Sequence, residues 1–374
     1  MIASSRPFRL LTLEPRPRAG VLVRVAVPLA SIVAAGVVGA LIVALAGASP
    51  LEAYREMFRS AFGGSRPVIR TLVLATPLIL TGLAAAISFR MLIWNIGAEG
   101  QLIVGAIAAS GVALAVDDVA GWIAIVSMVA AGTAAGAVWA LLAAVPRAYL
   151  RTDEVISTLM LNFIALHLMN YLIFGSVSFW RDTERLSFPQ GKVIPETTML
   201  PALWGRLHVG IIVAGVAAVL VWWVIRGTRW GFELRVIGDS PGAARYAGIN
   251  VGLKIIGVMA VSGALAGLAG AIEVGGVTRA LDPGSLSTGL GFTGIVVAAV
   301  ARLNPLGIVP TAILLAGLLN SGSSLQQLGI PFEAVLLLQG VILLFVAGGE
   351  FVLSNRIRLR RRVAVAAEPA GERP

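Results

Sequence analysis

Long apolar runs, separated by short polar or turn-forming stretches, fill most of this 374-residue chain and limit what it can fold into. A helix needs about 20 apolar residues to cross ~30 Å of hydrocarbon, and ten segments approach that length. They are residues 21–48, 68–89, 91–115, 121–144, 155–175, 208–226, 253–275, 289–302, 305–320 and 332–353. The segments 289–302 and 305–320 are short, and they form either a hairpin or a broken helix pair. The sequence predicts an all-α polytopic membrane protein with about ten transmembrane helices.

The composition excludes several classes of protein. With 57% hydrophobic residues, 13% charged residues and a mean hydropathy of +0.90, the chain is not a soluble globular domain. It has no cysteine, and its histidines, His167 and His208, are isolated, so we predict neither disulfides nor a metal site. We attribute the net charge of +10 to arginine-rich cytoplasmic loops and tails rather than to a nucleic-acid partner. Because it has no P-loop and no catalytic constellation, we do not expect an enzyme.

The distribution of basic residues predicts the orientation. With the N-terminus inside, 20 of the 29 Lys and Arg residues fall on cytoplasmic segments and 9 on outer ones. This bias places both termini in the cytoplasm, as basic tails (residues 1–20 and 354–374) around a transmembrane domain of residues 21–353. Five spans precede residue 190 and five follow it, which is compatible with a 5+5 inverted repeat.

A polar stretch, Asn95-Ile-Gly-Ala-Glu99-Gly-Gln101, interrupts the third apolar segment. A carboxylate at bilayer depth costs roughly 2.5–3.5 kcal/mol and normally faces protein or water. The glycines on either side of it permit a bend or a close helix contact. We therefore predict that Asn95, Glu99 and Gln101 line or brace a solute path. For Glu99, a hydrogen-bonding or packing role beside the path is the alternative.

The fifth span carries polar side chains near its start. Ser157 or Thr158 can share one helix face with Asn162, and hydroxyl and carboxamide groups suit a neutral polyhydroxylated solute. Hydrogen bonding between helices is the alternative role for each of the three. Asp153 and Glu154 lie at the cytoplasmic start of this span, where acids complement the helix dipole.

The long inner loop, residues 227–252, contains a compact helical signal. Ser240-Pro241 predicts a helix start and Gly248 its end. The residues between them are small apart from one Arg and one Tyr, so the segment is either a projecting knob or an ordinary amphipathic loop helix. In the seventh span, Gly263, Gly267 and Gly270 form a small-residue face, for which we predict close helix packing.

Four motifs together resemble one transporter family. Residues 240–248 look like the coupling segment of ABC-transporter permeases for simple sugars, nucleosides and branched-chain amino acids, and Asn95–Gln101 resembles that family's signature in the third span. Arg151-Thr-Asp-Glu-Val-Ile-Ser-Thr-Leu-Met-Leu-Asn162 and Gly291-Phe-Thr-Gly-Ile-Val-Val-Ala-Ala-Val-Ala-Arg-Leu-Asn-Pro-Leu-Gly307 resemble its nucleoside-type, basic membrane lipoprotein-associated branch. The resemblance runs in order from about residue 50 to residue 350.

This resemblance implies the permease subunit of an ATP-driven importer in the bacterial cytoplasmic (inner) membrane, for nucleosides or a simple sugar. It implies that the chain binds no cofactor and that a separate ATPase, a fused double ATPase, uses ATP and Mg. The resemblance places the ATPase contact on Ser240, Pro241, Gly242, Ala243, Ala244, Arg245, Tyr246, Ala247 and Gly248. It also implies a paralogous second permease, giving a heterodimer, and an extracytoplasmic solute-binding lipoprotein. The rival hypothesis is a stand-alone ion-coupled secondary transporter, with Glu99 as its ion or proton site and the inner loop as a linker.

Overall fold

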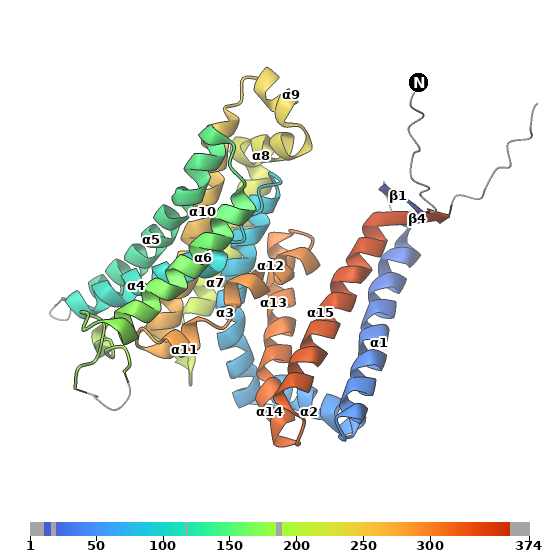
Figure 1. Cartoon of the computed structure of the whole chain (residues 1–374), viewed down its shortest axis with the longest axis horizontal. Helices are drawn as coiled ribbons and strands as arrows, with labels where there is room; N and C mark the ends of the chain where they lie inside the picture. The colour runs from blue at the N-terminus through green and yellow to red at the C-terminus, as the bar shows by residue number, and fades with distance from the viewer. Residues whose placement is uncertain (1–10, 16–19, 117–118, 185–188, 360–374) are drawn as a thin grey trace, which may run out of the picture. The chain divides into compact units, whose positions relative to one another are not determined.

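A computed structural model of the chain describes residues 11–15, 20–116, 119–184 and 189–359, and it divides into two units (Figure 1). One unit comprises residues 1–41 and 340–374. In it, strand β1 (Leu11–Pro15) pairs antiparallel with β4 (Asn355–Leu359), next to helices α1 (Val21–Leu45) and α15 (Phe332–Ser354). A Cβ atom added at Gly349 would collide with Ser31, so these two helices are in close contact. The predicted tails, residues 1–20 and 354–374, lie mostly outside the described residues.

The second unit, residues 42–339, is almost entirely helical. Its elements are α2 (Pro50–Phe62), α3 (Ser65–Phe89), α4 (Ala98–Ala115), α5 (Gly121–Leu150), α6 (Glu154–Asn170), η1 (Tyr171–Gly175), η2 (Glu196–Thr198), β2 (Ala202–Trp204), β3 (Leu207–His208), α7 (Gly210–Gly227), α8 (Arg229–Asp239), α9 (Pro241–Tyr246), α10 (Val251–Glu273), η3 (Val274–Thr278), α11 (Pro283–Leu286), α12 (Leu290–Val300), α13 (Pro305–Asn320), α14 (Gly322–Gln327) and the first part of α15. The segments η1 and η3 are π-helical, and β2 and β3 form a small antiparallel hairpin.

The helices confirm an all-α polytopic membrane protein. Within the described residues, eight helical segments are long and apolar enough to cross a membrane, and a bent pair, Leu29–Leu45 with Pro50–Phe62, raises the number to nine. Each of the ten predicted spans contains a helix, although the last qualifies only as a shorter apolar helix, Phe332–Ile342. The sixth span begins at Gly210, which leaves His208 outside it on β3.

One predicted span is wrong at its start. We expected a continuous helix over residues 91–115, but the helix begins only at Ala98. Residues 90–92 instead form a turn, in which Leu92 has a φ of 56°, and residues 93–96 have no regular secondary structure. Residues 91–115 are apolar over the length that a membrane span needs, which is why we expected one helix. Apolar length alone does not show where the backbone leaves the helical conformation.

Glycines bring α4, α5 and α10 into direct backbone contact. A Cβ atom added at Gly136 of α5 would lie 2.6 Å from the Cα of Gly267 on α10, closer than real Cβ atoms come. Added Cβ atoms at Gly105 and Gly263 would also meet backbone atoms of the facing helix, and one at Gly270 would meet the backbone of α4. The packing role predicted for the glycines of the seventh span is therefore confirmed.

Helix α3 is the buried centre of this unit, with every residue from 75 to 89 buried. It packs against α7, α10, α12 and α13. The outer helices expose large apolar side chains instead, as Ile156, Met160, Phe163 and Ile164 do on α6. Because water would penalise so much exposed apolar surface, these faces indicate contact with lipid or with another membrane-embedded subunit.

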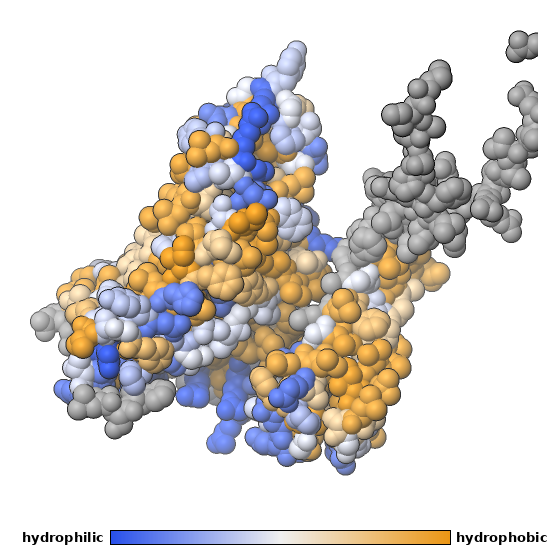
Figure 2. Space-filling view, viewed as in Figure 1, coloured by the Kyte–Doolittle hydropathy of each residue, from blue (hydrophilic) through white to orange (hydrophobic). Residues whose placement is uncertain are grey.

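The two ends of this unit differ from its apolar middle. Helix α9 lies at one end, and α11 and the chain after α6 lie at the opposite end (Figure 1). Figure 2 shows hydrophilic side chains concentrated around the α8–α9 end and at the opposite end, with hydrophobic side chains between them. This pattern is what a bilayer-spanning unit requires. Below, the α9 end is called the inner end and the opposite end the outer end, following the orientation that the basic residues predict.

Candidate functional site

A buried polar network surrounds the break before α4. The Asn95 side chain is fully buried, and its amide nitrogen lies 2.8 Å from Ser262 Oγ on α10 and 3.1 Å from Gln101 Oε1 on α4. Gln101 Nε2 in turn donates to Asn95 Oδ1 at 3.1 Å, and Ser262 donates to the carbonyl of Ala84 on α3 at 2.7 Å. The network therefore joins α3, α4 and α10 through the non-helical segment 90–97.

Helix α6 is attached to the same segment. Asn162 donates to the Ile96 carbonyl at 2.9 Å and accepts from the Gly100 N–H at 2.8 Å, and Thr158 Oγ1 accepts from the Ile96 N–H at 3.3 Å. Thr158 and Asn162, four residues apart, thus share the face that meets α4. Ser157 does not join them: it is half-buried, and its hydroxyl donates to the Asp153 carbonyl at 2.7 Å.

The Glu99 carboxylate caps another helix. Its Oε1 accepts from the Gly289 N–H at 2.9 Å and its Oε2 from the Gly291 N–H at 2.6 Å, at the start of α12. The first N–H groups of a helix have no partners within the helix and carry a partial positive charge, so a carboxylate is well placed there. The side chain is 6% exposed, and both of its oxygens are hydrogen-bonded.

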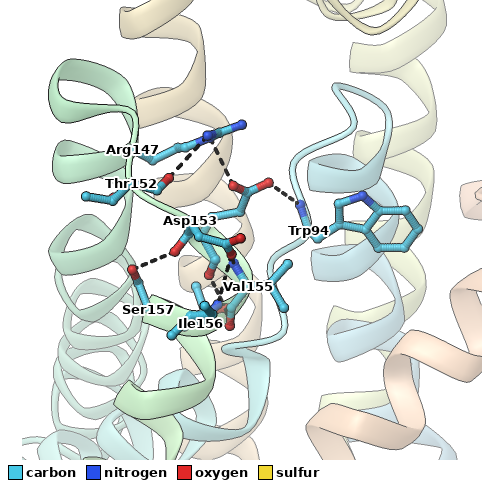
Figure 3. Close-up of polar contacts among 9 residues, drawn as sticks. Trp94, Arg147, Thr152, Asp153, Val155, Ile156 and Ser157 are labelled. Carbon is cyan, nitrogen blue, oxygen red and sulfur yellow. Dashed lines mark hydrogen bonds and ion pairs between the residues drawn. The ribbon is translucent and has the colours of Figure 1, made fainter. Parts of the chain in front are cut away.

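A second buried carboxylate, on Glu154 at the start of α6, contacts α5 at Arg147 and segment 90–97 at Trp94 (Figure 3). Glu154 lies 3.0 Å from Arg147 Nε and accepts from the Trp94 N–H at 3.3 Å, and Arg147 also donates to the Thr152 carbonyl. Asp153 caps α6 by accepting from the two N–H groups that follow Glu154, as its position predicted. The contacts of Glu154 had no sequence signal, because Trp94 is sixty residues away.

The inner loop folds into two short helices, α8 and α9. Ser240 caps α9 by accepting from the Ala243 N–H at 3.3 Å, Pro241 is the first residue of the helix, and Gly248 follows it with a φ of 79°. The start and end predicted for this helix are therefore confirmed. The Tyr246 side chain is 97% exposed, whereas Ala244 is fully buried against its own chain.

The inner loop also contacts segment 90–97, which carries Asn95 of the polar network. A Cβ atom added at Gly238 of α8 would collide with the Arg90 carbonyl, so α8 rests directly on the end of α3. Glu233 of α8 forms an ion pair with Lys254 at the start of α10. Arg90 itself donates to the Leu303 carbonyl at 2.7 Å, in the turn between α12 and α13. These contacts can therefore transmit a movement of α8 and α9 to α3, to α10 and to the α12–α13 turn.

This arrangement suits mechanical coupling rather than covalent chemistry. The buried polar groups of segment 95–101 are engaged with protein partners, so they brace four helices and the start of α12 against one another. In the part of the chain that the structure describes, no three His, Cys, Asp or Glu side chains lie close enough to hold a metal ion. Together, the membrane-spanning helices, the braced break and the projecting inner helix define a membrane permease.

Comparison with known proteins identifies the family. Residues 68–347 match the model of the branched-chain amino acid transport system permease component, and the chain belongs to this family of ABC-transporter permeases. It is 38% identical over 345 residues to the guanosine ABC transporter permease protein NupP of Bacillus subtilis, covering 90% of this chain and 97% of that protein. No solved structure matches the chain.

Two further relatives have similar coverage. The nucleoside ABC transporter permease protein NupB of Lactococcus lactis is 32% identical, covering 87% of this chain and 91% of its own length. The glucose ABC transporter permease protein TsgB13 of Haloferax volcanii is 32% identical, covering 93% of each chain. B. subtilis and L. lactis each have a second, shorter match, NupQ and NupC. The chain is therefore a multi-pass transport subunit of the cell membrane and not an enzyme.

Proposed function

We propose that this permease carries nucleosides into the cell as part of an ABC importer. Two relatives that span about nine-tenths of the chain are named for guanosine and for nucleosides, and these names support the solute class. A simple sugar is the second candidate, because one relative of similar coverage is named for glucose. Both classes are neutral and rich in hydroxyl groups.

The contact between the inner loop and segment 90–97 is the observation that carries the mechanism. In the proposal, a separate ATPase binds α9 and contacts its exposed residues Arg245 and Tyr246. Closure of the ATPase around ATP and Mg shifts α8, which presses on Arg90 through Gly238. Segment 90–97 passes this displacement to the helices that Asn95, Gln101, Thr158 and Asn162 brace together.

The remaining partners follow from the same proposal. A second permease completes the pathway, since B. subtilis and L. lactis each have two matching permeases. We propose that this partner is a paralogue, that the ATPase is a fused double ATPase, and that an extracytoplasmic lipoprotein delivers the solute to residues 50–66 and 176–207. Helix α2 provides a regular element in the first of these regions, since Ser49 caps it and Pro50 starts it.

The proposed role of Glu99 is to brace the pathway. Ion coupling requires a carboxylate that can exchange a proton or a cation. Both Glu99 oxygens instead accept backbone N–H groups at the start of α12. This geometry argues against the secondary-transporter hypothesis, which relied on a free Glu99.

The proposal is tested by reconstituting the complete importer in liposomes, with its ATPase, second permease and lipoprotein. Nucleoside uptake, ATP hydrolysis and co-purification of the ATPase are then measured. Tyr246→Ala and Arg245→Glu should reduce co-purification of the ATPase and uncouple nucleoside uptake from ATP hydrolysis. Central Tyr and Arg contacts are worth about 2 kcal/mol or more, which is roughly a thirtyfold loss of affinity. Both changes lie on the surface, so the permease should still fold.

A matched control is Tyr171→Ala on η1, because Tyr171 is also exposed, at 60%, and lies at the outer end, away from α9. It should leave both ATPase binding and uptake close to wild type. Normal coupling in the two α9 variants would place the ATPase interface elsewhere. Ala244→Trp is unsuitable as a docking test, because Ala244 is buried in the loop's own packing.

A further inference from the structure

A cavity of about 320 Å³ lies at the outer end of the second unit, far from the inner loop. Helix α10 starts just after α9 at the inner end, so its last residue, Glu273, lies at the outer end. The cavity's polar lining comes from the start of α3, the β2–β3 hairpin, the end of α10, the residue that follows η3, and the end of α13. These residues are Arg70, Arg206, His208, Glu273, Arg279 and Asn320.

The wall of this cavity contains an unused hydrogen-bond donor, on His208. The ring is 2% exposed, and its Nδ1 accepts the Gly210 N–H at 3.2 Å, so in the neutral imidazole the proton is on Nε2. Burial lowers the pKa of His208, which keeps the ring neutral near pH 7. The buried Nε2 has no partner within the described residues. Gly276 fixes the ring's place, since an added Cβ there would come within 2.7 Å of it.

Glu273 offers an unused acceptor. Three glutamates are buried in the described chain, and the protein satisfies the carboxylates of two, Glu99 and Glu154. The third, Glu273, is 7% exposed and lines the cavity, and no side-chain hydrogen bond or ion pair to it is found within the described residues. A buried polar group without a partner is costly, so such a group persists where it has a task.

The backbone beside Glu273 also departs from regular helix. The next five residues, Val274–Thr278, form the π-helix η3, and they include Gly275 and Gly276 of the cavity lining. Short π-helical segments occur frequently at functional sites. Here η3 follows the carboxylate directly and contributes the glycine surface against which His208 packs.

The chemistry of the lining selects a neutral polar ligand. Three exposed arginines, Arg70, Arg206 and Arg279, surround the cavity and repel a cation, whereas the group that meets Glu273 must be a hydrogen-bond donor, which an anionic group is not. A ligand that satisfies both buried groups must donate a hydrogen bond to Glu273 and accept one from His208 Nε2–H. The hydroxyls of a ribose and the amide edge of a nucleobase each offer such a pair. The volume falls at the lower end of the usual range for small-molecule sites.

We propose that this cavity is an outer-end binding site for a nucleoside-like solute, held between the Glu273 carboxylate and the His208 imidazole. The inference rests on the proposed function in so far as the ligand is the transported solute. The solute would reach this site after its delivery at the outer face. The arginine rim would then lie where it can help hold the solute's remaining acceptors.

The direct test uses the full-length permease in lipid nanodiscs, without the ATPase. Binding of radiolabelled guanosine, uridine and ribose is measured by equilibrium dialysis for wild type, Glu273→Gln and His208→Phe. Each variant should weaken binding about tenfold, because His208→Phe removes a hydrogen bond to the ligand and Glu273→Gln replaces a charge-assisted acceptor with a weaker neutral one. Glu196→Gln, which removes an exposed carboxylate from η2 at the same end, is the matched control and should bind as wild type does.

A thermal-unfolding measurement separates a binding role from a structural one. Glu273→Gln breaks no hydrogen bond of the described protein, so it should unfold at the wild-type temperature or above it while binding more weakly. Unchanged binding in both variants, or no binding of the three solutes to the wild type, would overturn the site. If the variants lose binding but the complete importer takes up none of these solutes, the site stands and the proposed function fails. If nucleoside uptake proceeds with full affinity in both variants, the proposed function stands and the site fails.

Discussion

Replacing Glu99 with Gln should destabilise the permease, because the carboxylate is the acceptor for two backbone donors at the start of α12. The amide keeps one oxygen, but it turns an NH₂ group towards the second N–H. One charge-assisted hydrogen bond is lost and two donors face each other in a buried site. The first loss is about 1.5–3 kcal/mol, and an unsatisfied buried donor adds about 1–3 kcal/mol. We therefore expect a loss of about 2.5–6 kcal/mol in the free energy of unfolding.

The assay is reversible unfolding in mixed detergent and sodium dodecyl sulfate micelles, followed by the fluorescence of the eight tryptophans. A change of about 3 kcal/mol, within the expected range, corresponds to roughly a 150-fold change in the folding equilibrium constant. Glu196→Gln, on the exposed η2 segment, should change the unfolding free energy by no more than about 0.5 kcal/mol. A loss below about 1 kcal/mol for Glu99→Gln would show that the cap on α12 is not a significant source of stability.

Two further predictions concern orientation and pH. Thr197→Cys and Ala247→Cys, both exposed in this cysteine-free chain, should react with an impermeant maleimide from opposite sides of the membrane, and labelling from one side would refute the orientation. Because burial lowers the pKa of His208 below its unfolded value of 6.5, the unfolded state binds the proton more readily. The stability that His208 contributes is therefore present above pH 6.5 and lost as the pH falls through the folded pKa. His208→Phe should flatten this dependence in unfolding titrations, whereas an unchanged profile would exclude His208 as its source.

Local signals predicted the local structure well. The cap and end of α9 follow from Ser240, Pro241 and Gly248, since each acts on its immediate neighbours. Apolar length found the spans for the same reason, because a bilayer requires it of every crossing segment. The close contact of α10 with α5 was predictable as well, since residues such as Gly263 and Gly267 leave no side chain between the helices.

The partners of the buried polar groups were not predictable. Glu99 binds backbone N–H groups about 190 residues later, and any residue type can supply a backbone N–H. The sequence therefore showed that Glu99 needs a partner without showing which one. His208 and Glu273 were missed for a related reason, since only the tertiary fold brings a hairpin residue and the end of α10 to one cavity. A lone acid near the end of a span was the only available signal.

The glycine contacts described above have a dynamic consequence. Helices whose backbones touch cannot slide or rotate past one another without separating first, so α4, α5 and α10 should move as one rigid body. Distances between spin labels placed on any two of these helices would then stay constant through the transport cycle. The displacement that alternates access must instead arise at other contacts of this body, where side chains separate the helices and can change partners.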